Sequence, residues 1–155
     1  MTDTAQALPH WDMSVVYPSL TSPEFEQGFR DLSEHIDQLR ALFEREQIAA
    51  HTAQPLDDAT IARFETVIER YNDLLEAAGT MRSYISSFVA TDSRNNVAQA
   101  KMSELQRRLV TLTQLGTRFT AWIGALDVDA LIARSQLAEE HAFALWQARR
   151  QAEHL

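Results

Sequence analysis

The sequence predicts an all-α fold, a bundle of long antiparallel helices with an extended N-terminal arm and no sheet. Helix-breaking residues are scarce: the 155 residues include only four glycines and four prolines, and three of the prolines lie in the first 23 residues. Alternating β-branched and aromatic runs that end in Asn-Gly or Asp-Gly turns, the usual signature of paired strands, do not occur. The length suits one domain with one hydrophobic core.

The N-terminal segment, residues 1–22, mixes prolines with apolar side chains and is expected to be an extended docking arm. The first helix is expected to begin at Pro23, because Ser22 can cap the free N–H groups and proline suits the first helical position. It should fade within residues 48–52, before the loop that Pro55 opens. Apolar residues at alternating spacings of four and three predict its core face: Phe25, Phe29, Leu32, Ile36, Leu39 and Phe43.

The second helical region is expected to be one long helix, capped by Asp57 or Asp58 and kinked at Gly79. Asp92 is expected to end it and to cap the third helix, which starts at Ser93 and is about thirty residues long, spanning roughly 45 Å. Both helices carry apolar stripes. Their predicted core positions include Ile61, Phe64, Val67, Ile68, Tyr71, Leu74, Leu75 and Ala78 in the second, and Val97, Met102, Leu105, Leu109, Leu112, Leu115, Phe119 and Trp122 in the third.

Two shorter helices are expected near the end of the sequence. Asp127 is a plausible cap for a short helix through Leu131, and a last helix should begin at about Leu137. Its apolar members are Phe143, Leu145 and Trp146. Because no Gly or Asn stop signal follows, we expect the natural chain to continue beyond residue 155.

The composition argues against several classes of partner. The formal net charge is −8 and Lys101 is the only lysine, whereas nucleic-acid binding requires clustered cations that neutralise phosphates. No stretch approaches the ~20 unbroken apolar residues of a membrane-spanning helix. The first ten residues contain no Lys or Arg and lack a secretory pattern. We therefore expect no nucleic-acid partner, no membrane partner and a cytoplasmic location.

No catalytic motif is present in the sequence. A zinc-protease helix needs two histidines four residues apart, with Glu directly after the first. The five histidines are scattered and none is followed by Glu: His10, His35, His51, His141 and His154. The absence of cysteine excludes disulfides and thiolate ligands, and Asp31 with His35 is expected to be a surface ion pair. We assign no catalytic, cofactor-binding or metal-binding residue to this chain.

Two segments resemble a known family. Residues 11–18 read Trp-Asp-Met-Ser-Val-Val-Tyr-Pro and are similar to the W-D-L-S-x-x-Y-P opening of the oligoendopeptidase F family, zinc metallopeptidases related to thimet oligopeptidase. Residues 84–92 place hydroxyl groups among aromatic side chains. They resemble a stretch in that family where the second helix gives way to the third. Without the resemblance, these hydroxyl groups could face a groove lined by peptide, or they could cap the helix end and pack against it. We expect that they cap and pack.

The resemblance implies that the parent protein is a cytoplasmic zinc metalloendopeptidase that hydrolyses oligopeptides. Its H-E-x-x-H helix and zinc would lie beyond residue 155, so zinc is a cofactor of the parent and not of this chain. Residues 23–155 would be its helical N-terminal domain, a lobe that walls the substrate channel and admits only short or unfolded peptides. The partners implied are the catalytic domain and, in the parent, an oligopeptide substrate.

The alternative is a free-standing helical module that binds partner proteins and has no enzymatic role. A severed lobe should expose an apolar patch and self-associate, whereas a free-standing module should be a monomer or a specific dimer. The side chains expected to face the catalytic domain are Val15, Val16, Ile85, Phe88, Phe143 and Trp146.

Overall fold

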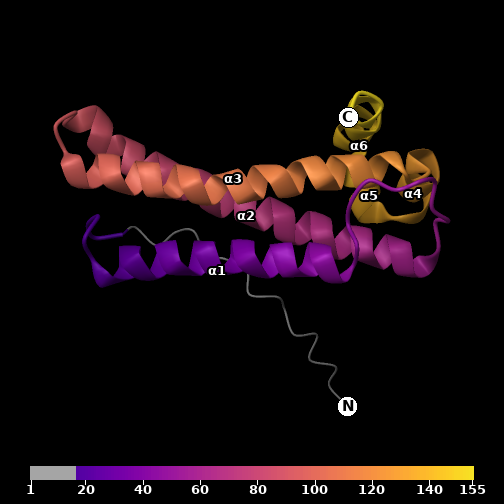
Figure 1. Cartoon of the computed structure of the whole chain (residues 1–155), viewed down its shortest axis with the longest axis horizontal. Coiled ribbons are helices and arrows are strands. Elements are labelled where there is room, and N and C mark those ends of the chain that lie inside the picture. Colours follow the sequence, from indigo (N-terminus) through magenta and orange to yellow (C-terminus); the bar gives the residue numbers. More distant parts are fainter. Residues whose placement is uncertain (1–16) are drawn as a thin grey trace, which may run out of the picture.

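The computed structural model describes residues 17–155. These residues form helices and no strand, and 78% of them are helical, which confirms the predicted all-α class. Three long helices lie side by side and alternate in direction: α1 (Pro23–Arg45), α2 (Asp58–Thr91) and α3 (Asn96–Gly124) (Figure 1). None of the helices in the described part of the chain is long and apolar enough to cross a membrane.

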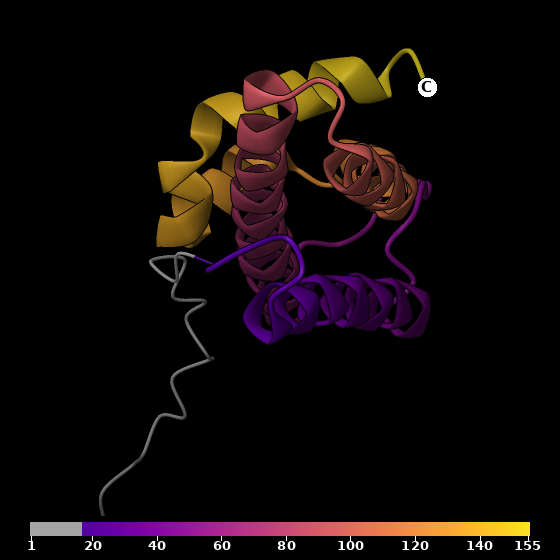
Figure 2. The ribbon, with the colours of Figure 1, turned by 90° about the vertical axis from the view of Figure 1, so that its left-hand side faces the viewer.

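The last part of the chain folds back over one end of the long helices. The short helices α4 (Val128–Arg134) and α5 (Gln136–Glu140) lead into α6 (Ala142–Ala152). Helix α6 runs across α3 and is seen nearly end-on in Figure 1, and from the side in Figure 2. Close contact is possible because Gly124 of α3 faces Ala152, where any larger side chain on α3 would collide with the alanine methyl group.

The core is aromatic where the long helices meet. All six residues of the stripe predicted for α1 are buried, which confirms that prediction. Phe119 of α3 lies at the centre of a cluster, with ring centroids 6.1 to 6.3 Å from those of Phe43, Phe64, Tyr71 and Trp122. Burial of these rings adds to the hydrophobic driving force that packs the three helices together.

Two predicted core positions are wrong. Leu75 of α2 is 45% exposed, and Val97 of α3 is 46% exposed. Each has a buried neighbour in sequence, Leu74 and Ala98 respectively. Adjacent residues on a helix point about 100° apart. Only one residue of each pair can therefore point toward the neighbouring helices, and the other faces solvent.

Helix α1 ends at Arg45, so the prediction that it fades within residues 48–52 is wrong. The end is a Schellman motif. The N–H of Ile48 donates to the carbonyl of Phe43 at 2.9 Å, and that of Gln47 donates to Glu44 at 3.3 Å. Gln47 adopts a left-handed conformation with φ of 55°, and both Ile48 and Phe43 are completely buried. An apolar Ile48 therefore closes the turn and does not extend the helix.

Replacing Gln47 with glycine is expected to raise the free energy of unfolding by ~1 kcal/mol, because a side chain at positive φ costs about 1–2 kcal/mol. The matched control is Gln54→Gly, at a position without positive φ, which should lower stability through the greater freedom of the unfolded chain. Urea unfolding monitored by circular dichroism measures both. Equal signs for the two variants would contradict the assignment of the motif.

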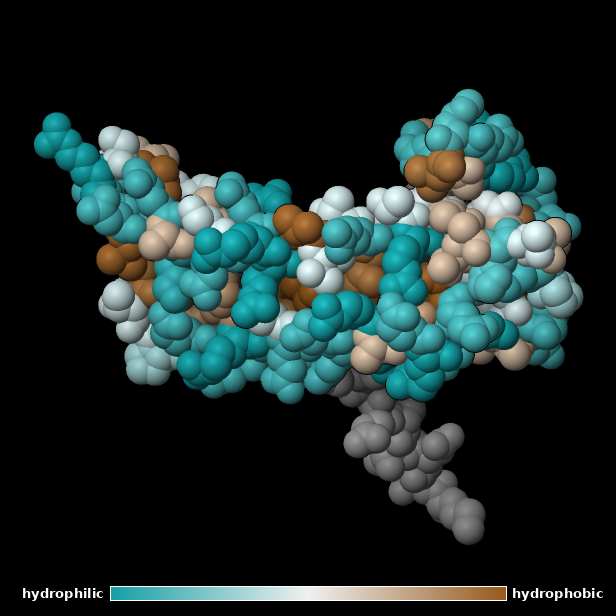
Figure 3. All heavy atoms as spheres, in the orientation of Figure 1, coloured by the Kyte–Doolittle hydropathy of each residue, from teal (hydrophilic) through white to brown (hydrophobic). Residues whose placement is uncertain are grey.

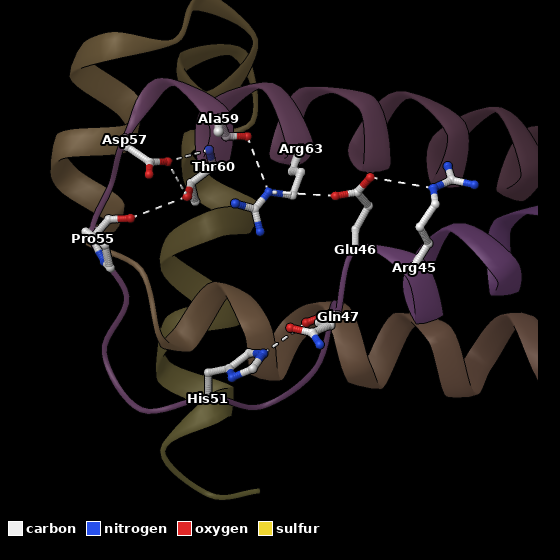
Figure 4. A network of polar contacts seen from close by, with 9 residues as sticks. All are labelled: Arg45, Glu46, Gln47, His51, Pro55, Asp57, Ala59, Thr60 and Arg63. Atoms are coloured by element: carbon white, nitrogen blue, oxygen red, sulfur yellow. Dashed lines mark hydrogen bonds and ion pairs between the residues drawn. The ribbon is translucent and has the colours of Figure 1, made fainter.

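Helix α2 begins as predicted and continues unbroken through Gly79. Asp57 is its cap: the carboxylate accepts from the backbone N–H of Thr60 at 2.8 Å and from its hydroxyl at 2.7 Å. These hydrogen bonds lower the pKa of Asp57 below its usual value. Figure 4 shows this cap beside Glu46, which lies between Arg63 and Arg45.

Two further boundaries differ from the expectation. Asp92 follows α2 as predicted, but Asn95 caps α3 by accepting from the N–H of Ala98 at 3.0 Å. Asp92 instead accepts from the N–H of Arg94 at 3.0 Å, so it stabilises the turn between the helices. The single last helix predicted from Leu137 is two helices, α5 and α6, joined at His141.

Lys101 connects α3 to α1. Its ammonium group lies 2.9 Å from the carboxylate of Glu26 and 3.7 Å from that of Glu104. It also lies over the rings of Phe29 and Phe25, at 5.3 and 5.9 Å from their centroids. A cation in contact with both carboxylates and aromatic faces contributes through charge and through packing.

Candidate functional site

Among the described residues a groove lies between α2, α3 and α6, with a volume of about 650 Å³. In the space-filling view the surface is hollowed where α6 rises from the pair formed by α2 and α3 (Figure 3). This groove, called here the α6 groove, falls in the size range of about 300–1,000 Å³ typical of ligand sites. Its lining is Ile68, Tyr71 and Asn72 from α2, Thr113, Gly116, Thr117, Phe119, Thr120 and Ile123 from α3, with His141, Ala144, Leu145, Ala148, Gln151, His154 and Leu155.

One polar contact holds α6 against α2 in this groove. His141 Nδ1 lies 2.9 Å from the carbonyl oxygen of Leu137, which can only accept a hydrogen bond, so Nδ1 carries a proton. In the neutral ring Nε2 is then an acceptor, and the amide of Asn72 lies 3.1 Å from it. His141, the residue that joins α5 to α6, thus anchors the start of α6 to α2.

The floor of the groove depends on a close approach between α2 and α3. The hydroxyl of Tyr71 lies against Gly116, where a Cβ atom would collide with it. Burial raises the pKa of Tyr71, so its phenol stays protonated at neutral pH. Gly116 therefore allows an aromatic residue to form the floor without separating the two long helices.

A second cluster lies at the other end of α2, where the described part of the predicted arm begins. The hydroxyl of Tyr84 donates to the backbone carbonyl of Tyr17 at 2.8 Å. The Tyr17 ring packs edge-on against Phe25 and Tyr84, at centroid distances of 5.4 and 5.3 Å. Burial, together with the charge of Asp31, raises the pKa of Tyr17. Tyr17 is thus docked, while residues 1–16 lie outside the described part of the chain.

The hydroxyl groups of Ser87 and Thr91 are bonded within α2. Ser87 donates to the carbonyl of Tyr84 at 2.6 Å, and Thr91 donates to that of Ser87 at 2.7 Å. The Phe88 ring packs edge-on against Tyr84 at 5.1 Å. Of these groups Tyr84 makes the contact with Tyr17, and none of them lines the α6 groove.

The side chains predicted to face a catalytic domain divide into three groups. Ile85 is completely buried within the chain, so its assignment is wrong, and Phe88 is partly buried against the core. Phe143 is 67% exposed and Trp146 is 41% exposed, and these two define the α6 outer face. Val15 and Val16 lie outside the described residues.

The α6 outer face is held in place by Asp129 of α4. Its carboxylate accepts from the indole N–H of Trp146 at 3.0 Å and pairs with Arg149 at 3.2 Å. The Trp146 hydrogen bond and then Arg149 lower the pKa of Asp129 from its usual value of 3.8. An exposed tryptophan thus has a defined orientation.

This contact is expected to depend on pH. The pKa of Asp129 is lower in the folded state than its unfolded value of 3.8. The contact of Asp129 with Trp146 and Arg149 is therefore fully formed above pH 3.8 and is lost as the pH falls through the lower folded pKa. The NMR resonance of the Trp146 indole N–H should shift with a midpoint below 3.8. The completely buried Trp122 indole reports global unfolding, and a simultaneous change of both resonances would contradict a local tie.

The described histidines are not gathered into a metal site. Within residues 17–155 no three His, Asp or Glu side chains are arranged to hold a metal ion. His141 and His154 both line the α6 groove, whereas His51 lies 3.0 Å from the carbonyl of Gln47 in the loop after α1 (Figure 4). His10 lies outside the described residues.

The α6 groove is not apparent from the sequence. Its lining comes from three helices, and its two histidines are thirteen positions apart and read as isolated residues. The available signal was the run of Thr113, Thr117 and Thr120 at helical spacing, beside Gly116. Such a stripe is typical of close helix contacts as well as of ligand sites, so it does not specify a groove.

Comparisons with protein-family models, with curated proteins and with solved structures returned no match. What this chain does is therefore inferred from its own residues and contacts.

Proposed function

We propose that this chain is the non-catalytic N-terminal lobe of a cytoplasmic zinc metalloendopeptidase of the oligoendopeptidase F type. The observation that supports this most is the hydrogen bond from Tyr84 to the carbonyl of Tyr17. The two segments that resemble the family, residues 11–18 and 84–92, are far apart in sequence, yet they meet at this contact.

The proposed role of the lobe is steric. Long helices packed around an aromatic core are stiff, and a stiff wall excludes folded proteins from a channel without contributing a reacting group. The α6 outer face, Phe143 and Trp146, is the proposed contact with the catalytic domain, because exposed aromatic side chains are enriched where proteins associate. Zinc and the general base would belong to that domain.

The proposal is tested by comparing this chain with the protein encoded by its full reading frame. This chain should bind no zinc and hydrolyse no peptide, whereas the longer protein should bind one zinc ion and cleave short unstructured peptides but not folded proteins. A reading frame without an H-E-x-x-H helix would refute the peptidase. Loss of the catalytic domain's contact in Phe143→Ser, but not in Val110→Ser, would support the α6 outer face as the interface.

The second candidate is a free-standing interaction module, which the exposure of Phe143 and Trp146 also favours. Sedimentation velocity separates the two. A severed lobe should self-associate with rising concentration, and Phe143→Ser should abolish this. A module that evolved to stand alone should remain a monomer or one defined dimer over the same range.

A further inference from the structure

We propose that the α6 groove binds an uncharged, apolar stretch of peptide in an extended conformation. This inference rests on the proposed function and names a substrate class for it: oligopeptides with consecutive apolar side chains.

The charge of the groove selects a neutral occupant. The chain contains 22 acidic and 14 basic residues, yet among the described residues that line the groove there is no Asp, Glu, Lys or Arg, and His141 and His154 are its basic side chains. A phosphate or carboxylate group placed there would lose hydration without gaining a Lys or Arg partner, which is costly. Nucleotides and acidic peptides are therefore poor fits.

The polar groups of the groove match a peptide backbone. The hydroxyls of Thr113 and Thr117 donate to carbonyls of their own helix, at 3.0 and 3.3 Å. Their oxygen lone pairs remain as acceptors for N–H groups of a ligand. Gln151 on the opposite wall offers both an amide donor and a carbonyl acceptor. A backbone with alternating donors and acceptors can use both kinds of group.

The dimensions and the apolar surface agree with a short extended segment. Along α3 the lining runs from Thr113 to Ile123, about 15 Å at 1.5 Å per residue. An extended chain covers that length with about four or five residues at ~3.3 Å each. Leu75 and Val110, 45% and 55% exposed, lie one helical turn from Tyr71 and Thr113 and extend an apolar track beyond the groove.

Fluorescence polarisation with this chain tests the proposal. The probe is a fluorescein-labelled peptide of about eight residues with leucine and valine at its centre, and the reference peptide carries glutamate at the central positions. The apolar peptide should bind saturably, and the glutamate peptide at least ~10-fold more weakly. No saturable binding of the apolar peptide, or equal binding of both, would overturn the proposal.

Matched variants locate the binding site. Thr117→Glu places a charge in the groove and should weaken binding at least ~10-fold, while Gln114→Glu adds the same charge on an exposed part of α3 outside the lining and should have no effect. Likewise Ala144→Trp fills the groove, and Gln147→Trp does not. Because all four positions are exposed, each variant should keep its helical circular dichroism. Equal losses in a groove variant and its control would refute the site.

The remaining outcomes are also decisive. If the groove is filled by a second copy of the chain, Thr117→Glu will dissociate a dimer seen in sedimentation, and the peptide proposal fails. The proposed function fails separately, if the full reading frame encodes no zinc helix. Peptide binding by this chain would be unaffected by that result.

Discussion

Replacing Phe119 with alanine is expected to lower the free energy of unfolding by ~3–5 kcal/mol. The Phe119 ring lies within 6.3 Å, centroid to centroid, of rings from α1, α2 and α3 itself. Its loss leaves a cavity that no single helix can close, since the surrounding rings are held by separate elements. A domain is stable by only ~5–15 kcal/mol, so this one substitution should remove a large fraction of the total stability.

Urea unfolding measures the effect, and Val110→Ala is its control. Val110 lies on the same helix but is 55% exposed, so its truncation should change stability by no more than ~0.5 kcal/mol. A loss below ~1 kcal/mol at Phe119, within the range of ordinary surface substitutions, would show that this cluster is not the centre of the core.

Replacing Gly28 with alanine is expected to change stability with opposite signs in two backgrounds. In the wild type a Cβ atom at Gly28 would lie 2.5 Å from the hydroxyl oxygen of Tyr17 and 2.9 Å from its Cε1 atom. The ring must then move away from Phe25 and Tyr84, and such overpacking costs about 1–3 kcal/mol. In a Tyr17→Ala background the obstacle is gone, and alanine should gain ~1 kcal/mol over glycine in a helix.

The four chains of this double-mutant cycle are compared by thermal and urea unfolding. Gly79→Ala is the matched control, because a Cβ atom there would meet nothing within 4 Å. It should gain ~1 kcal/mol in both backgrounds. If Gly28→Ala stabilises the wild type as much as the Tyr17→Ala variant, Tyr17 is not docked on α1, and the contact between the two family-like segments is lost with it.

The helix starts were largely predictable because they depend on local chemistry. Ser22, Asp57 and Asp127 each accept a hydrogen bond from a backbone N–H three residues later, which is the spacing that a cap requires. The stripe of α1 was predictable for the same reason, since its period places six side chains on one face. For α3 the expected cap was Asp92 and the observed cap is Asn95, so the local pattern was not sufficient there.

Features that depend on contacts between helices were not predictable. Arg118 of α3 adds a contact from another helix to the turn that ends α1: its guanidinium donates to the carbonyl of Ile48 at 3.2 Å and to Glu44 at 2.7 Å. A propensity argument at residues 45–52 contains no information about a side chain on α3. The exposure of Leu75, predicted as a core position, is another example, because it depends on where α2 meets its neighbours.

The sequence by itself determined that this chain is helical, where α1, α2 and α4 begin and which faces of the long helices are apolar, because these properties follow from period and capping within a few residues. It also determined that no zinc-protease motif is present. Only the tertiary structure decided that Tyr17 meets Tyr84, that Phe143 and Trp146 face outward, and that α6 crosses α3 to form an uncharged groove. Each of these depends on the side chains that distant helices bring together, and close packing selects those only when the whole core forms.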